Sequence, residues 1–548
     1  MKVKSIKDAI HGYIRLEEPF WKIIDTAEFQ RLKWIEQTSY RVLYPSARHD
    51  RFIHSIGVYH LGQKAIQGFL NNCDVKDAEI VKKYKYSFLL ACLLHDIGHA
   101  PFSHTCENLF SYKEKIGDKN SNINREFLAE IKLHLYDSVY AVFEKDYFSL
   151  ILKNPPAVHE IMSSIITCRK FSDYSNFFAN DNIVFLDLDL IVRSIIGCCY
   201  SYKRTDNEEI RLELGIKNCL IRLLNSSTVD VDKLDYIARD TQMSGYDSIV
   251  LDNKRLLDNV CIVNNDGIYY PAFRKGALSV LSNVVIAKNS QAKWIINHPV
   301  VIYEAYLLCK AIGTSLANSG LRNENGDILS SDEIISFIFS SASLSKEGHK
   351  HSCGVFRLLS DIEILNLMKS NMEHPVVSEY FSRDERKSPV WKSNEEFLFC
   401  LDSNEDKAAE IAEYMAPLIS FFNDIDDITD ACQINSSILE NDSLKERQDN
   451  ETIQNLIKVL LEYRSNVSYV ILPAKNTFYA RIDADKLYIR FEDSSQNYTT
   501  YKKLEGEDKG ISDKRYGFFY LYSSKKINPK EFLSYLYDKA HSDTSYAP

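Results

Sequence analysis

The sequence predicts a mainly α-helical protein with a small α+β domain at its C-terminal end. Three observations support this fold class. Glycine and proline, which interrupt helices, number only 19 and 13 in 548 residues, about half of ordinary usage. From residue 1 to about 430, apolar residues recur at helical spacing between short polar loops, and we detect no internal repeat. Beyond residue 455, short β-rich runs alternate with turn residues.

The segment Ala78–Leu94 gives the clearest helical signal. Its apolar residues follow helical spacing, and the chain then enters HDIGHAPFSH, where Gly98 and Pro101 turn the backbone. We therefore expect a mostly buried helix that delivers His95 and Asp96 at its C-terminal end.

A polar stretch at residues 435–454, poor in aromatic residues, predicts a boundary between a helical domain, 1–435, and an α+β domain, 455–548. After it, YVILPA, TFYARI, KLYIRFE and GFFYLYS are typical of strands, with a hairpin turn expected at 483–485. A last helix is expected from about Pro529.

The composition narrows the functional classes. The formal net charge of −10, from 66 basic and 76 acidic residues, argues against a general binder of polyanions. The stretch YKKLEGEDKGISDKRYGFFYLYSSKK mixes basic and aromatic residues, but we interpret it as a packing module, so nucleic acid is not a favoured partner.

We find no apolar run near the roughly 18 residues that span a bilayer, and the N-terminus lacks the apolar core of a signal peptide. Twelve cysteines without a C-x-x-C pair indicate reduced thiols, and a cytoplasmic protein with no membrane partner is expected.

The histidines are concentrated in one part of the chain. Eight of the 14 fall within 111 residues: His49, His54, His60, His95, His99, His104, His134 and His159. Histidine combines metal ligation with proton transfer near neutral pH, so this concentration indicates a functional site.

Four residues form a candidate metal site: His54, the adjacent pair His95 and Asp96, and Asp232. Two imidazoles and two carboxylates suit a divalent ion such as Mn²⁺, Mg²⁺, Fe²⁺ or Zn²⁺. A water on such an ion has a lowered pKa and can attack phosphorus. Alone, a His-Asp dipeptide also fits an ordinary histidine at a helix end.

The residues after this dipeptide favour a site. His99, His104 and Glu107 follow within a short, turn-rich segment, and packing alone seldom requires three histidines in ten residues. These side chains are candidates for proton transfer beside the metal ligands.

The segment VDKLDYIARD places three polar side chains on one helix face, at Asp232, Tyr236 and Asp240. Lys233 lies one step around the helix, where an ammonium could neutralise a phosphate while the tyrosine and second aspartate hold a sugar. The alternative is a solvated face of ordinary i, i+4 ion pairs such as Asp235 with Arg239.

The order H…HD…D resembles the HD-domain metal phosphohydrolases, and longer strings are more specific. DAIHGYIRLEEPFWKIIDTAEFQRLKWIEQ, YPSARHDRFIHSIGVYHL, LLHDIGHAPFSHTCE, VHEIM and DVDKLDYIARD are similar to deoxynucleoside triphosphate triphosphohydrolases. Within that group they resemble the branch of the bacterial dNTPases and the vertebrate sterile-alpha-motif and HD-domain dNTPase. The resemblance covers roughly residues 1 to 310.

The resemblance implies a helical HD phosphohydrolase core and a role for each matching residue. The implied metal ligands are His54, His95, Asp96 and Asp232. His104 matches the histidine that protonates the leaving oxygen, His159 matches a second active-site histidine, and Glu107 stands where the family often has aspartate. The residues matching phosphate contacts are Arg51 and Lys233, those matching sugar contacts are Tyr236 and Asp240, and Gln37 matches a glutamine near the sugar and base. The implied reaction is attack of water on the α-phosphorus of a nucleoside triphosphate, releasing a nucleoside and tripolyphosphate.

The chain departs from the family in KNSQAKWIINHP. Lys288 replaces an arginine, Ile296 a tyrosine and Pro299 a lysine. Lysine cannot form the bidentate phosphate contact of arginine, and isoleucine has no hydroxyl, so these departures bear on substrate choice.

Asp25 and Gln30 match positions where some family members bind an activating nucleotide, whereas Lys33 replaces an arginine there. The resemblance thus implies a homo-oligomer, a dimer or tetramer, and leaves open an allosteric nucleotide at a subunit interface. Two other functions also stay open. One is hydrolysis of another phosphorylated nucleotide, such as a ribonucleotide, an alarmone or a cyclic nucleotide; the other is nucleotide sensing without catalysis.

Overall fold

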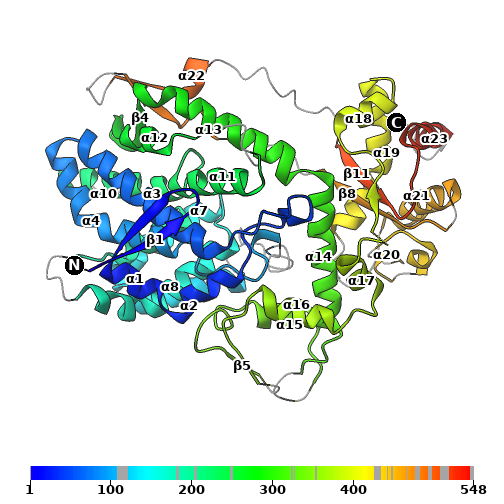
Figure 1. The fold of residues 1–548 in the computed structure, drawn as a ribbon, viewed down its shortest axis with the longest axis horizontal. Coiled ribbons are helices and arrows are strands. Elements are labelled where there is room, and N and C mark those ends of the chain that lie inside the picture. Colours follow the sequence, from blue (N-terminus) through cyan, green and yellow to red (C-terminus); the bar gives the residue numbers. More distant parts are fainter. Residues whose placement is uncertain are drawn as a thin grey trace. The chain divides into compact units, whose positions relative to one another are not determined.

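The chain folds into two compact units that interleave in sequence (Figure 1). The structure is a computed structural model, and it describes residues 2–105, 107, 121–179, 184–202, 207–246, 251–322, 325, 327–351, 354–384, 386–424, 433–440, 442–445, 448–464, 466–474, 482–491, 497–505 and 517–542. The first unit comprises Met1–Gln291, Ile335–Glu363 and Ala480–Asp508. The second comprises Ala292–Ile334, Ile364–Tyr479 and Lys509–Pro548.

Helices dominate the first unit, as the fold class predicts. They are α1 (Glu18–Ile24), α2 (Ala27–Gln30), α3 (Arg51–Asn72), α4 (Val75–Leu94), α6 (Asn122–His134), α7 (Asp137–Ile151), α8 (Val158–Phe178), α9 (Leu188–Ile196), α10 (Glu208–Leu224), α11 (Val231–Met243), α12 (Asn253–Asp258), α13 (Leu278–Gln291) and the short α22 (Tyr501–Glu505). Short 3-10 helices lie at Arg31–Trp34, Tyr40–Val42 and Lys275–Ala277.

The core of the first unit lies around α3 and α4, which pack against each other. Helix α11 packs on α3, α9 packs on α4, and α8 packs on α9. Residues 87–100, the end of α4 and the turn after it, are all buried. The helix predicted to end at Leu94 and to deliver His95 is therefore confirmed. Neighbouring helices shield its last turns from solvent.

The first unit also contains strands that the helical interpretation of residues 1–430 missed. Strand β1 (Val3–Asp8) pairs with β2 (Gly12–Glu17), and β3 (Val260–Asn265) pairs with β4 (Ile268–Arg274), both antiparallel. The second pair turns through Asp266 and Gly267, both with positive φ. The expectation that residues 1–430 are wholly helical is therefore wrong at both strand pairs. For β3 and β4 the sequence held a hairpin signal, the Asp-Gly turn between β-branched and aromatic residues.

The predicted C-terminal strands divide between the units. Strand β9 (Tyr488–Arg490) pairs in parallel with β4 and antiparallel with β10 (Tyr498–Thr500), which gives the first unit a sheet in the order β10-β9-β4-β3. The two units therefore do not follow the expected boundary between 435 and 455, because pairing with β4 holds residues 480–508 in the first unit. A small hairpin, β5 (His349–His351) with β6 (Gly354–Phe356), lies in the same unit. The expected strand TFYARI lies outside the described residues except for its last residue.

The second unit combines helices with a three-stranded sheet in the order β7-β11-β8. Its elements are a π-helical turn (Ala292–Ile296), α14 (Pro299–Ala317), α17 (Pro375–Phe381), β7 (Ser388–Pro389), α18 (Asn394–Cys400), α19 (Glu405–Asp424), a 3-10 helix (Ser436–Glu440), α20 (Asp442–Lys445), α21 (Asn450–Tyr463), β8 (Tyr469–Pro473), β11 (Phe519–Ser523) and α23 (Pro529–Ser542). Helices α15 (Ser331–Ile338) and α16 (Asp361–Lys369) lie where the chain passes between units. The strands predicted in YVILPA and GFFYLYS and the helix predicted from Pro529 are confirmed.

Helix α14 is long and apolar enough to meet the length and hydropathy of a membrane-spanning helix, with a mean hydropathy of 1.4. The expectation that no stretch of the chain is long and apolar enough to span a bilayer is therefore wrong. In the structure, 67% of the apolar window is buried within the protein. A core helix of a soluble protein meets the same criterion, so the helix by itself is weak evidence for a membrane.

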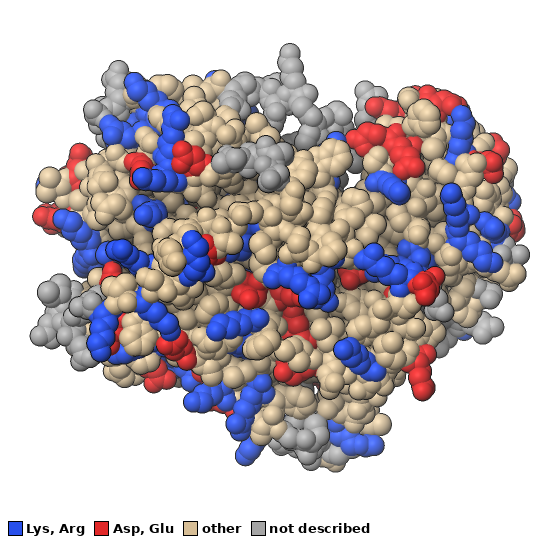
Figure 2. Space-filling model, viewed as in Figure 1, with Lys and Arg blue, Asp and Glu red and all other residues tan. Residues whose placement is uncertain are grey.

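Charges of both signs are interspersed over the molecular face shown in Figure 2. This distribution agrees with the modest net charge of −10. On that face the basic groups are accompanied by acidic groups, which is untypical of a surface built to coat nucleic acid.

Candidate metal centre

The four predicted metal ligands come from three parts of the first unit and converge. His54 lies in the first turn of α3, His95 and Asp96 directly follow α4, and Asp232 lies in the first turn of α11. His54 Nε2 is 3.0 Å from Asp232 Oδ1 and 3.5 Å from Asp96 Oδ2. His95 Nε2 is 3.5 Å from Asp232 Oδ1 and 3.4 Å from Asp96 Oδ1. The sequence thus predicted a set of side chains that folding does bring together.

The two imidazoles are oriented as metal ligands. His95 Nδ1 lies 3.0 Å from the carbonyl oxygen of Cys92, which can only accept, so the ring proton resides on Nδ1. His54 Nδ1 lies 2.8 Å from Asp235 Oδ2. Both Nε2 atoms are buried without an aligned hydrogen bond partner among the described residues. Two buried Nε2 atoms facing two carboxylates are a donor set that fits a divalent ion.

Asp235 is the residue that fixes the His54 ring. Its carboxylate is fully buried, and besides His54 it accepts hydrogen bonds from His11 Nε2 at 2.6 Å and from Arg239 at 2.8 and 2.9 Å. Burial opposes ionisation, but the Arg239 guanidinium and the two imidazoles hold the pKa of Asp235 well below its usual range. Gly57 makes this possible, because a Cβ there would lie 2.0 Å from Asp235 Oδ1.

The network continues to the N-terminal hairpin. Arg239 also donates to Asp8 at 2.8 Å, and Asp8 accepts the backbone N–H groups of Ile10 and His11 at the hairpin tip. Sequence reasoning named the Asp235–Arg239 pair only within its alternative, a solvated face of ordinary ion pairs, and gave no role to His11. The signal was in the string DAIHGY, where an aspartate and a histidine flank a turn.

Arg51, predicted to contact phosphate, begins α3 and lies against the metal ligands. It donates to Asp96 Oδ2 at 2.7 Å, to Ser103 Oγ at 3.0 Å and to the carbonyl oxygen of Gln37 at 3.3 Å. Burial works against ionisation of Asp96, but the Arg51 guanidinium and neighbouring histidines hold its pKa well below the usual range.

The turn after Asp96 brings His99 beside α8. The Gly98 N–H donates to Ser163 Oγ at 2.9 Å, and a Cβ at Gly98 would lie 2.2 Å from the Ser163 nitrogen. Only glycine permits this approach. As a result the His99 ring stacks on that of His159, one turn earlier on α8, with ring centroids 4.0 Å apart.

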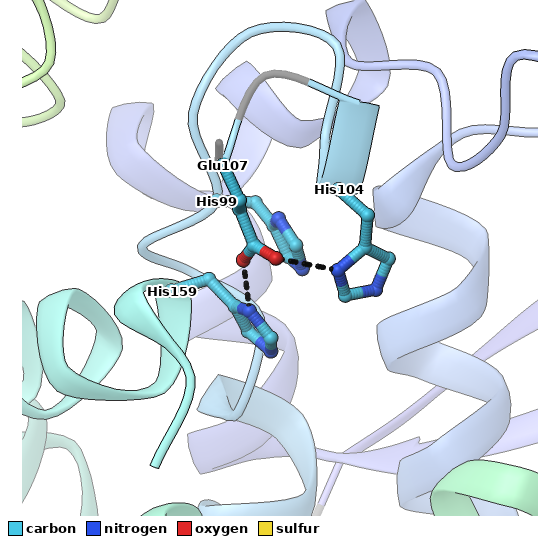
Figure 3. Close-up of side chains that lie close together, drawn as sticks. All are labelled: His99, His104, Glu107 and His159. Atoms are coloured by element: carbon cyan, nitrogen blue, oxygen red, sulfur yellow. Dashed lines mark hydrogen bonds and ion pairs between the residues drawn. The ribbon is translucent and has the colours of Figure 1, made fainter. Parts of the chain in front are cut away.

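His99, His104, Glu107 and His159 form a second group, which we call the histidine–glutamate cluster (Figure 3). His104 Nδ1 lies 2.8 Å from Glu107 Oε2, and His159 Nδ1 forms a short hydrogen bond with Glu107 Oε1. Burial opposes both charges, but the ion pair lowers the pKa of Glu107 and raises that of His159 to about 9. The side chain of His104 is 60% exposed, so this imidazole can meet a substrate.

One carboxylate contacts both groups. Asp96 Oδ1, which approaches His95, is also 3.3 Å from His99 Nε2 and 4.0 Å from His159 Nε2. The predicted ligands and the predicted proton-transfer residues are therefore adjacent parts of one site.

The turn that carries His104 is strained and held from far along the chain. Phe102 and Ser103 have φ values of 61° and 51°, a region that side chains other than glycine rarely adopt. Asp361 Oδ1 accepts the Phe102 N–H at 2.7 Å, and Asp361 Oδ2 accepts the Glu36 N–H at 2.9 Å. No sequence signal pointed to Asp361, which is 259 residues away from Phe102.

Residues 51–154 match the family model of the HD domain. This range contains His54, His95 and Asp96, the three ligands of the H…HD pattern. The chain contains an HD domain. Asp232 and His159 lie beyond the matched range, in α11 and α8. We call the predicted ligand set His54, His95, Asp96 and Asp232 the HD centre.

Relatives of the chain share only part of their length with it. An uncharacterized protein of Mycoplasma genitalium is 27% identical over 293 residues, 53% of this chain and 55% of that protein. The deoxynucleoside triphosphate triphosphohydrolase SAMHD1 homolog of Dictyostelium discoideum is 28% identical over 273 residues, 48% of this chain and 42% of that protein. The deoxynucleoside triphosphate triphosphohydrolase SAMHD1 of Xenopus laevis is 42% identical over 110 residues, 20% of this chain and 17% of that protein. The chain thus spans about half, or less, of the length of these curated relatives.

Residues predicted to hold the substrate lie on α11 and α13. Lys288, from α13, donates to the Tyr236 hydroxyl through a short hydrogen bond, and its ammonium lies 4.3 Å from the centre of the ring. Burial and the nearby Lys233 ammonium lower the pKa of Lys288 to about 8. Lys233 itself donates to Asp230 Oδ2 at 2.5 Å and to the carbonyl oxygen of Ser226 at 2.7 Å.

The carboxylate of Asp240, a predicted sugar contact, is already hydrogen-bonded to other residues of the protein. One oxygen lies 2.7 Å from His49 Nε2, and the other accepts from Gln291 Nε2 at 2.8 Å. Gln37, by contrast, is buried with a side-chain oxygen that has no hydrogen bond partner among the described residues. Gln37 therefore has a free acceptor oxygen for a bound molecule, whereas both oxygens of Asp240 are engaged by neighbouring side chains.

Proposed function

We propose that this HD-domain protein is a metal-dependent phosphohydrolase that cleaves deoxynucleoside triphosphates into deoxynucleoside and tripolyphosphate. The observation that carries the proposal is the convergence of two buried imidazole Nε2 atoms and two carboxylates beside a histidine–glutamate cluster. This arrangement places a metal-binding donor set and proton-transfer groups around one carboxylate, Asp96.

Different residues would bind the metal, stabilise the phosphate charge and transfer the proton. His54, His95, Asp96 and Asp232 would hold a divalent ion, which when bound lowers the pKa of a water and neutralises phosphate charge. Arg51 adds a fixed positive charge beside Asp96, where negative charge develops on the phosphorus oxygens. His104, exposed and oriented by Glu107, is placed to give a proton to the leaving oxygen, and the partly buried pair His159–Glu107 keeps that imidazole in position.

The choice of a deoxynucleoside triphosphate rests on the named relatives and on the substrate side of the site. Tyr236 and Lys288 together present a ring face and a cation, which suits a sugar next to a phosphate. Lys288 in place of an arginine also favours a second candidate, hydrolysis of another phosphorylated nucleotide, because a lysine imposes no bidentate phosphate geometry.

The test is a panel of dNTPs, ribonucleotides, an alarmone and cyclic nucleotides, each assayed with Mn²⁺, Mg²⁺, Fe²⁺ and Zn²⁺, with products separated by ion exchange. Tripolyphosphate and nucleoside from dNTPs are expected. Orthophosphate, pyrophosphate or ring opening would favour the second candidate, and binding without any product would refute hydrolysis.

Two variants control the assay. Asp232→Ala removes a ligand and should reduce turnover by at least about 10³-fold, because the attacking water is no longer activated. His134→Ala, whose side chain pairs with Glu130 on α6 outside both groups, should match the wild type. Equal activity of Asp232→Ala after metal reloading would contradict the assignment of the HD centre.

A further inference from the structure

A cavity of about 350 Å³ lies in the first unit, where α3 ends and α4 begins, against α10 and the strands β3, β4 and β9. Its lining comprises residues 73–77, Leu212, Ile262, Asn264, Tyr269 and Arg490. His54 and Cys73 lie near opposite ends of α3, about 28 Å apart at 1.5 Å per residue. The cavity is therefore separate from the HD centre, and its volume is that of a small-molecule site.

Arg490 is a buried cation without an acidic partner. The residue is only 7% exposed, and no carboxylate among the described residues forms an ion pair with it. Its terminal nitrogens donate long hydrogen bonds, of 3.4 and 3.3 Å, to the carbonyl oxygens of Ile262 and Asn72, and its Nε has no partner in that part of the chain. Burial of an unpaired charge is costly, so a buried arginine usually meets an anion. This wall of the cavity therefore suits an anionic group of a ligand.

The first turn of α4 adds backbone donors to the same cavity. Its N-cap residue, Asp74, makes no side-chain hydrogen bond to the helix, and Ala78 donates to the Asp74 carbonyl oxygen at 2.9 Å. The N–H groups of residues 75–77 precede that bond and have no acceptor within the helix. They carry the positive end of the helix dipole, which favours a carboxylate or phosphate oxygen. Arg490 and this turn thus favour the same kind of group.

Two carboxylates limit the charge that the ligand can carry. Asp74 and Asp77 both line the cavity, and neither side chain has an ion pair or a hydrogen bond among the described residues. Burial and the Asp74 carboxylate raise the pKa of Asp77 to about 6, as expected of an acid with no cation beside it. Together with Lys76 and Arg490, the lining carries two charges of each sign. A ligand with one charge of each sign matches it better than a phosphate dianion does.

The rest of the wall is apolar. Leu212 from α10, Ile262 from β3 and the ring of Tyr269 from β4 line it. The Tyr269 ring lies against α10, because a Cβ at Gly215 would be only 2.3 Å from its Cδ2 atom. A cavity with a cationic wall, two unpaired carboxylates and an apolar surface has a complement for each part of an apolar amino acid.

We propose that this cavity binds an apolar α-amino acid. The carboxylate of the ligand binds Arg490 and the N–H groups of the first turn of α4, and its ammonium faces Asp77. Its side chain packs on Leu212 and Tyr269. The site is independent of the proposed function, because none of these residues belongs to the HD centre or to the histidine–glutamate cluster.

Isothermal titration calorimetry of the full-length protein with L-leucine and L-phenylalanine tests the site without reference to hydrolysis. The titrations are run at about pH 8, where the Asp77 carboxylate is ionised. At least one of the two amino acids should bind, with one molecule per chain. Isocaproate and hydrocinnamate lack the ammonium, and isoamylamine and phenethylamine lack the carboxylate. Each analogue should bind at least about tenfold more weakly than its parent, because it loses a charged hydrogen bond partner.

Variants assign the two ends of the ligand. Asp77→Asn should weaken binding of the amino acid about tenfold and leave the binding of the analogue without an ammonium unchanged. Asp137→Asn is the matched control, since Asp137 lies in the first turn of α7 outside the cavity, and it should match the wild type. Arg490→Met should weaken the amino acid and spare the amine. Because Arg490 is buried, Leu212→Trp, which fills the cavity from α10, is a second probe and should abolish binding. Circular dichroism checks that each variant is folded.

Three results would overturn the proposal: no binding of either amino acid to the wild type, wild-type affinity in both Asp77→Asn and Leu212→Trp, or tighter binding of inorganic phosphate than of either amino acid. The last result would make the cavity a simple anion site. Nucleotide hydrolysis by a protein that binds no amino acid would leave the proposed function intact, and amino-acid binding by a protein without hydrolysis would leave this site intact.

Discussion

Asp235→Asn offers a sharp test of how the HD centre is built. Each oxygen of Asp235 receives two donors: Oδ2 accepts from His54 and Arg239, both at 2.8 Å, and Oδ1 accepts from His11 at 2.6 Å and Arg239 at 2.9 Å. Asparagine replaces one oxygen by an NH₂ group. In either orientation of the amide, that NH₂ group therefore faces two other donors.

Two magnitudes follow. Loss of a carboxylate that orients a ligating histidine weakens metal binding about 10- to 100-fold, which is about 1.4 to 2.7 kcal/mol. Breaking the buried pair with Arg239 lowers the free energy of unfolding by about 3 kcal/mol, although Asp8 still holds that guanidinium at 2.8 Å. The first effect is specific to the metal, whereas the second is a general loss of stability.

The assay measures both. Metal-stripped protein is titrated with Mn²⁺ against a metal indicator dye, and chemical denaturation of the same protein gives the free energy of unfolding. Asp240→Asn is the matched control: Asp240 is buried on the same helix, but its partners His49 and Gln291 are not ligands. We expect Asp235→Asn to lose metal affinity and Asp240→Asn to keep it. Equal affinities in the two variants would refute the assignment of Asp235.

Three further outcomes are expected. Tyr236→Phe removes the acceptor of Lys288 and should raise the KM for nucleotide about fivefold, which corresponds to about 1 kcal/mol for the lost hydrogen bond; unchanged kinetics would contradict the contact. Burial raises the pKa of Asp361 to about 7 despite the N–H groups of Glu36 and Phe102, so the folded state retains a proton that the unfolded state has released. The free energy of unfolding of the wild type should thus fall by up to about 1.4 kcal/mol per pH unit as the pH rises from about 4 to 7. Asp361→Asn should gain stability relative to the wild type over that range, and melting temperatures of both proteins measured against pH would show it. If the two melting temperatures changed equally with pH, the effect would be excluded. Removal of metal by a chelator should lower the melting temperature by about 2 to 4 °C, since an ion at 100 times its Kd contributes about 2.7 kcal/mol, and a shift under 1 °C would argue against a bound ion.

Local patterns predicted the elements that have strong local causes. The helix ending at His95 and the helix beginning at Pro529 follow from apolar spacing and breakers, and both are confirmed. The hairpin at residues 260–274 also had a local cause, the Asp-Gly turn, which the helical interpretation overlooked.

Pairing between distant segments escaped prediction. The parallel pairing of β9 with β4 joins residues more than 200 positions apart, and nothing in either strand specifies its partner. For that reason the expected boundary near residue 435 and the two observed units differ. The homo-oligomer and the nucleotide regulator stay predictions for the same reason, because an interface is a property of surfaces that only assembly brings together.

The sequence by itself determined which residue types are the candidate metal ligands: His54, His95, Asp96 and Asp232 were predicted from their kind and order, since metal ions select donors by type. Only the tertiary structure decided what supports them. The Asp235 carboxylate reached His54 because Gly57 allows α3 and α11 to approach, and Asp361 reached the turn before His104 from a segment 259 residues away. Hydrogen bonds act over about 3 Å, whereas the sequence separations involved are tens to hundreds of residues, so packing had to place those partners.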